Sequence, residues 1–179
     1  LVGTFNATTE SYVDSLVSSD ANVGISAKNE ISTGDNGYQA IAGSAGVVGI
    51  GASVSNLDIT GKVAAYLGSD ATLSAGGNLD VNAELSVNSN PKTSSATVGG
   101  RAVGISSART VISGEAFAGM LDGAKLEKAN NANVKAHLTG KTNVYSVASS
   151  GGLAAITANV AKVDVTAKVT SEIGTGCTV

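Results

Sequence analysis

Two segments of the chain decide its fold, because they read as copies of each other. Residues 61–87 read GKVAAYLGSDATLSAGGNLDVNAELSV, and residues 114–140 read GEAFAGMLDGAKLEKANNANVKAHLTG. At a repeat length of about 53 residues, Leu73 aligns with Leu126 and Val179, and Val81 aligns with Val134. Self-similarity at a fixed period of this size is the sequence signature of a stacked array of repeats.

Further copies extend the array in both directions. Residues 22–27 resemble residues 78–83, and residues 45–53 resemble residues 100–108. We therefore interpret the chain as one array of 179 residues: a first copy over about residues 8–60, a second over 61–113, a third over 114–166 and a partial fourth over 167–179. Because the last copy is incomplete, we expect the chain to be a fragment of a longer protein.

Inside each copy, apolar residues recur at every second position, which predicts β-strands. Val48, Ile50 and Val54 alternate with Gly and Ser, and then the alternation slips by one position, so that Leu57 and Ile59 follow. The same slip recurs after residue 160. A slip at a fixed place predicts a corner or a bulge between two strands.

One segment also fits a helix. In residues 113–130, Ser113 could cap a helix whose apolar face would hold Phe117, Met120, Leu121 and Ala124. Residues 61–77 are the equivalent segment of the previous copy, and they read as strand. Because an array must keep one geometry to stack, we favour strand here as well.

These observations predict an all-β fold, a β-solenoid built from repeats of about 53 residues. Two coils of about 26 residues or three of about 18 could make up one repeat, and we favour two. We expect a stacked interior at the positions that recur between copies. These structural positions are Ile50, Ile105 and Ile156, which we place at one equivalent site, together with Leu73, Leu126, Val179, Val81 and Val134.

Composition argues against most catalytic and cofactor chemistry. The chain has one His and one Cys, which excludes an internal disulfide framework and a Cys/His zinc site. No Gly-rich segment is followed by Lys-Ser or Lys-Thr, and Gly-Gly-x-Gly-x-Asp calcium repeats are missing. We predict no enzyme, no cofactor and no metal.

The titratable residues are read as ordinary surface or core residues. His137 aligns with Glu84 on an alternating strand, and Cys177 aligns with the small residues Ala71 and Ala124, which predicts a buried thiol. Asp58 aligns with Asp164, but Val111 interrupts the series, so no ladder of acids is expected. The four tyrosines are too far apart in sequence to predict a platform for sugar stacking. The only basic concentration comprises Lys125, Lys128, Lys135, His137 and Lys141.

The recurring elements resemble the repeats of large secreted bacterial adhesins, of the leukotoxin-type filamentous adhesin and filamentous haemagglutinin-like class. They are the Gly-alternating strand over residues 46–54, the AYLGSDA segment over residues 65–71, and the AGGNLDVNA segment over residues 75–83. Residues 128–130, Lys-Ala-Asn, depart from the Ala-Gly-Gly pattern in the third copy. The resemblance implies a right-handed parallel β-helix, export by a partner transporter, and a secreted or cell-surface location.

We therefore expect a non-enzymatic shaft module of an adhesin or filament, which gives reach and rigidity. The alternatives are a self-assembling extracellular fibre subunit and a carbohydrate-active β-helix enzyme. The expected partners are other repeats of the same polypeptide, another chain bound end to end, or host or bacterial surface glycans or proteins. A net charge of −3 gives no footprint for nucleic acid, and no segment is long and apolar enough to span a membrane.

Overall fold

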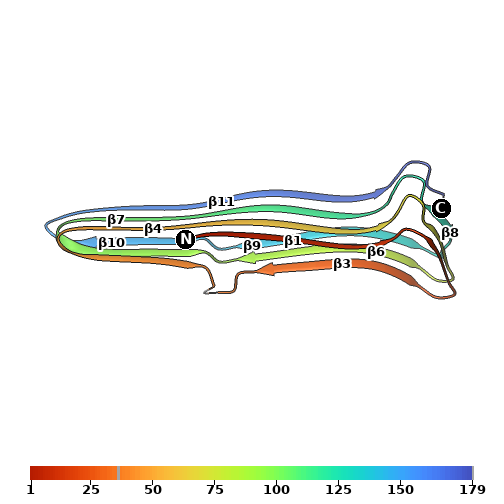
Figure 1. Ribbon diagram of the computed structural model, residues 1–179, viewed down its shortest axis with the longest axis horizontal. Helices are drawn as coiled ribbons and strands as arrows, with labels where there is room; N and C mark the ends of the chain where they lie inside the picture. The colour runs from red at the N-terminus through yellow and green to blue at the C-terminus, as the bar shows by residue number, and fades with distance from the viewer. Residues whose placement is uncertain (36, 179) are drawn as a thin grey trace.

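The computed structural model describes residues 1–35 and 37–178, and this part of the chain forms eleven strands and no helix. Figure 1 shows a flat molecule whose longest axis runs along the strands. The strands are β1 (Val2–Val13), β2 (Leu16–Ser19), β3 (Val23–Ser32), β4 (Gln39–Leu67), β5 (Thr72–Ala75), β6 (Leu79–Ser89), β7 (Lys92–Met120), β8 (Lys125–Lys128), β9 (Ala132–Thr142), β10 (Tyr145–Gly151) and β11 (Ala154–Ile173).

All strand pairs are parallel, and each joins one copy of the repeat to the next. Strands β1, β4, β7 and β10 form one sheet, in which β11 also pairs with β7, while β2-β5-β8 and β3-β6-β9 form two more. The all-β class and the strand assignment over residues 113–130 are confirmed, because β7 runs to Met120 and β8 follows.

The register shows how much chain one circuit of the fold uses. Gln39 pairs with Lys92, and Leu79 pairs with Ala132, each 53 positions further on. Two coils per repeat would instead pair residues about 26 positions apart, so that prediction is wrong. The reason is that β4 and β7, of 29 residues each, fold back on themselves, and one circuit consumes the whole repeat.

Glycines make the fold-back possible at one end of the molecule. β4 and β7 reverse their direction at the left of Figure 1. Gly46, Gly99 and Gly152 lie above one another in successive copies. A Cβ atom on Gly152 would collide with the carbonyl oxygen of Gly99, and one on Gly99 with that of Gly46. Only glycine lets the backbone of successive copies approach this closely.

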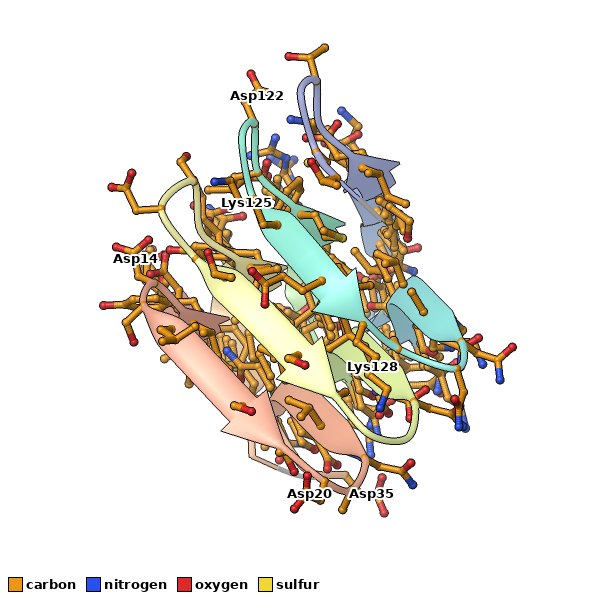
Figure 2. All side chains as sticks on the ribbon, turned by 90° about the vertical axis from the view of Figure 1, so that its right-hand side faces the viewer. Asp14, Asp20, Asp35, Asp122, Lys125 and Lys128 are labelled. Carbon is orange, nitrogen blue, oxygen red and sulfur yellow. The ribbon has the colours of Figure 1, made fainter. Side chains whose placement is uncertain are left out.

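At the opposite end, the short strands β2, β5 and β8 lie side by side and connect the two layers of the fold (Figure 2). Asp14 and Asp122 lie at the turns that lead into this end. The Oδ1 atom of Asp122 accepts a hydrogen bond of 2.7 Å from the backbone N–H of Thr175 in the next copy. Hydrogen bonds therefore connect the turns of successive copies, as they connect the strands.

The half of the molecule next to these short strands has an aliphatic interior, and we call it the body. Residues 57–67 of β4 and 110–120 of β7 face β6 and β9 across it. Gly61 leaves space for Leu85, because a Cβ there would lie 2.9 Å from Leu85 Cδ1. The largest fully buried aliphatic side chains of the body are Leu57, Ile59, Val63, Leu67, Leu73, Leu79, Val81, Leu85, Val87, Ile112 and Met120.

The other half, which we call the arm, comprises residues 39–55, 92–108 and 145–160. Its interior is narrow and lined by small or hydroxyl side chains. Thr93 and Ser106, on the two limbs of β7, approach to 2.6 Å between their hydroxyl oxygens. Ser106 also contacts Ser53 at 3.2 Å, and Thr93 contacts Ser146 at 3.2 Å, so hydroxyl groups connect three copies.

The slip in the apolar alternation marks the boundary between arm and body. Strand β4 crosses it without a corner or a bulge, because buried and exposed residues alternate in one phase from residue 49 to residue 65. The apolar residues instead move from the outer face of the arm to the inner face of the body. The predicted corner at this place is wrong, and the slip records an exchange of faces within one continuous strand.

Candidate functional site: columns of side chains along the stack

The surface of this fold is made of columns, because equivalent residues of successive copies lie side by side. Neighbouring strands are about 4.8 Å apart, so an outward side chain contacts its equivalents directly. Properties that recur every 53 residues therefore become continuous stripes.

The structure places four of the eight sequence-predicted structural positions in interior columns. Leu73 pairs with Leu126 in the β5–β8 sheet, and both are buried. Val81 is buried and pairs with Val134, which is partly buried. Val179 lies outside the described residues.

The three isoleucines are a correction. Ile50, Ile105 and Ile156 are 67%, 42% and 66% exposed, and they point outward. They do not form one column either: Val103 lies between Ile50 and Ile156, whereas Ile105 pairs with Ala52 and Ala158. The prediction of a stacked interior site was wrong because Gly and Ser, not the isoleucines, face inward in the arm.

Charged columns run along the outer face of the body. Glu115 Oε2 lies 3.5 Å from Lys62 Nζ, and its Oε1 lies 3.2 Å from Lys168 Nζ. The hydrogen bond from Lys168, followed by the nearby charges of both lysines, lowers the pKa of Glu115. A second group joins Asp164 to Lys162 at 3.1 Å and to Arg109 at 3.2 Å, and these contacts lower the pKa of Asp164.

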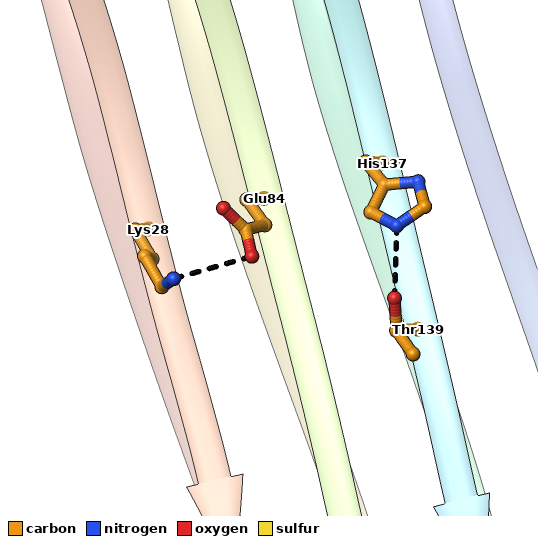
Figure 3. A network of polar contacts seen from close by, with 4 residues as sticks. All are labelled: Lys28, Glu84, His137 and Thr139. Atoms are coloured by element: carbon orange, nitrogen blue, oxygen red, sulfur yellow. Dashed lines mark hydrogen bonds and ion pairs between the residues drawn. The ribbon is translucent and has the colours of Figure 1, made fainter.

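The single histidine lies on the exposed face of β9, where Glu84 is its partner on β6, as the sequence alignment predicted. Figure 3 shows that His137 Nε2 contacts the hydroxyl of Thr139, at 2.9 Å, whereas Glu84 contacts Lys28 at 3.2 Å. Cys177 is a free, partly buried thiol whose sulfur donates to the carbonyl oxygen of Leu121 at 3.2 Å.

The acids do not form a ladder along the stack, as the sequence alignment predicted. Asp58 and Asp164 both pair with Val111, which lies between them. Across residues 1–35 and 37–178, no three His, Cys, Asp or Glu side chains gather where they could hold a metal ion. The outward side chains instead form columns along the stack, such as Lys62, Glu115 and Lys168.

An aromatic column was missed at the sequence level. The rings of Tyr12 and Tyr66 stack at 5.3 Å between centroids, and Phe117 meets Tyr66 edge-on at 6.3 Å. Tyr12 and Tyr66 are register partners on β1 and β4, so the repeat spacing could have revealed this column. Separation in sequence therefore did not keep Tyr12 and Tyr66 apart in the fold.

A second missed feature is the outer face of the arm, which we call the aliphatic face. It comprises the outward residues of three neighbouring strands: Val48, Ile50, Ala52 and Val54 of β4, Arg101, Val103, Ile105 and Ser107 of β7, and Ala154, Ile156, Ala158 and Val160 of β11. Val48, Ile50, Ile156 and Val160 are each more than half exposed. Apart from Arg101 and Ser107, these side chains are aliphatic, and they form one continuous apolar patch on the outer face of the sheet.

No protein-family model, curated protein or solved structure matches this chain. Where the chain is described, it contains no helix that is long and apolar enough to cross a membrane.

Proposed function

We propose that the chain is a non-enzymatic structural module: a length of β-solenoid, of the right-handed parallel β-helix type, in the shaft of a secreted or cell-surface bacterial adhesin or filament. The observation that carries this proposal is the continuous parallel pairing of successive repeats. β4 pairs with β7 over almost its whole length, and β7 pairs with β11 in the same register. Nothing in such a circuit needs a specific catalytic side chain.

The geometry favours rigidity over reach. Each 53-residue repeat adds one strand spacing, about 4.8 Å, along the stack. The long strands instead make every circuit wide, and their ladders resist bending across the molecule. A shaft of this type is a stiff, broad ribbon, and its length is gained slowly with added repeats.

Adding repeats provides the test of the array. We expect a chain in which residues 61–113 are duplicated to unfold cooperatively, with a higher midpoint and a steeper denaturant dependence than the parent chain. Small-angle scattering is expected to show an unchanged longest dimension and a thicker stack. An added copy that unfolds separately from the rest would contradict the proposal.

The location is tested on bacteria that produce the parent protein. Antibodies against this chain are expected to label intact cells or the culture medium. Labelling that requires lysis of the cells would contradict an extracellular shaft.

A self-assembling fibre subunit is the second candidate, because the apolar edge of β11 could pair either with a further repeat or with another chain. Val165, Val169 and Ile173 continue interior columns of the body, yet they are about half exposed. Unpaired strand edges with apolar side chains readily pair with another chain. This candidate predicts end-to-end assemblies whose mass in light scattering grows with concentration, whereas a strict monomer at high concentration would exclude it.

A further inference from the structure

The aliphatic face of the arm is unusual because the polarity of the arm is inverted. Its interior holds Gly49, Gly51, Ser53 and Thr97, whereas valine and isoleucine point to the solvent. An isolated sheet gains nothing from exposing these side chains, because apolar side chains are stabilised by leaving water. The inversion indicates that the outer face of the arm is the one that becomes covered.

The chemistry of the face restricts its occupant. Among its twelve outward positions, Arg101 is the only charged residue and Ser107 the only polar one. Directly beyond it on the same strands, the outward positions become charged, with Arg109 on β7 and Lys162 on β11. A charged or sugar-like partner would bind to those charged positions. A partner with an aliphatic surface fits the arm instead.

The relief of the face is complementary to itself. On the central strand β7, Ile105 protrudes between Ala52 and Ala158, its smaller neighbours. Two positions further along, Ser107 forms a hollow between Val54 and Val160. Alternation of large and small side chains lets two sheet faces interdigitate. A second copy related by a twofold axis would place its Ile105 over Ser107 and receive Ile105 over its own Ser107.

We propose that two copies of this chain pair side by side through their aliphatic faces, in addition to any contact along the stack. The face measures roughly 27 by 14 Å from strand and residue spacings, about 380 Å². A stable dimer buries about 800 Å² on each partner. Pairing of two chains with three strands each is therefore weak, and it strengthens with every further repeat that keeps the same outward pattern.

Ser107 and Ser113 supply a matched test, because both are half-buried serines that point outward from β7. Each is replaced by cysteine in a chain that also carries Cys177→Ser, and a short bismaleimide is added at increasing protein concentration. We expect Ser107→Cys to form covalent dimers severalfold faster than Ser113→Cys. Equal rates for the two variants would overturn the proposal.

A second variant separates side-by-side pairing from other association. Ile105→Asp is expected to leave the thermal melt nearly unchanged and to remove the advantage of Ser107→Cys, because the charge would be buried only in the pair. An unchanged advantage would overturn the proposal. Contact along the stack lies at the edge strands and not at β7, so light-scattering assemblies that persist in Ile105→Asp test the fibre candidate independently.

Discussion

The body and the arm are continuous along the same strands, yet they hold their layers together in different ways. In the body, aliphatic side chains fill a wide interior. Leu85, for example, occupies the space that Gly61 leaves free. In the arm, Gly49 and Gly51 let the layers approach closely, and hydroxyl groups such as those of Thr93 and Ser106 bond across the gap. Burial of apolar area stabilises the body, and short polar contacts hold the two layers of the arm together.

One ladder of backbone hydrogen bonds thus supports two kinds of interior. Parallel pairing in register is shared by both regions, so it does not depend on what the interior contains. The side chains decide how far apart the layers lie and which face meets the solvent. An outer face that is aliphatic in the arm and charged in the body then divides the surface into two types of stripe.

The largest expected effect comes from truncating the interior of the body. Leu85→Ala should lower the free energy of unfolding by about 2–5 kcal/mol, because it removes buried methyl groups and leaves a cavity. The matched change in the arm is Ile50→Ala. It should shift the free energy of unfolding by only about 0.5 kcal/mol, as at ordinary surface positions. Urea denaturation of the two variants makes the comparison. A larger loss for Ile50→Ala than for Leu85→Ala would reverse the assignment of inner and outer faces.

An intermediate effect is expected from the hydroxyl contacts in the arm. Ser106→Ala should cost about 1–2 kcal/mol, since it removes the partner of Thr93 and of Ser53 in a buried site. Ser95 is the control, because it is a buried serine of the same strand whose hydroxyl has no hydrogen-bond partner. Ser95→Ala should be neutral or stabilising. Equal losses in the two thermal melts would show that the hydroxyl contacts do not specify the arm.

The smallest expected effect concerns the charged column of the body. Because Lys168 and Lys62 lower the pKa of Glu115, their contribution is present above its usual pKa of 4.5 and is lost as the pH falls through the lowered value. Glu115→Gln should therefore reduce the difference between the melting temperature at pH 7 and the melting temperature below pH 4.5. Since the groups are exposed, the effect should also fade with added salt. A pH dependence that Glu115→Gln leaves intact would assign it to other carboxylates.

Much of the fold follows from the sequence. The repeat spacing identifies Leu73 and Leu126 as partners, and it pairs Glu84 with His137. Strand rather than helix over residues 113–130 also follows, because one geometry must recur. These features depend on local alternation and on spacing, both of which the sequence shows directly.

The remaining features depend on which face of a strand is covered. Alternation of Ile50 with Gly49 and Gly51 shows two faces, but it does not tell which of them is inside. The ordinary preference for buried isoleucine gives the wrong answer in the arm. Placing Ile50, Ile105 and Ile156 at one site also required unequal steps along the chain, whereas the strands pair at a constant step, which puts Ile105 beside Ala52 and Ala158. The number of circuits per repeat was likewise set by distant pairing and not by any local pattern.

A distance between two spin labels decides whether neighbouring strands of the sheet are 53 residues apart along the chain. Labels at Asp58→Cys and Asp164→Cys, in a chain with Cys177→Ser, lie on strands that both pair with Val111. Two strand spacings separate them, so we expect strong dipolar broadening at about 10 Å. Two circuits per repeat would separate the same positions by about 19 Å. Broadening at the shorter distance supports the account, and its absence would contradict it.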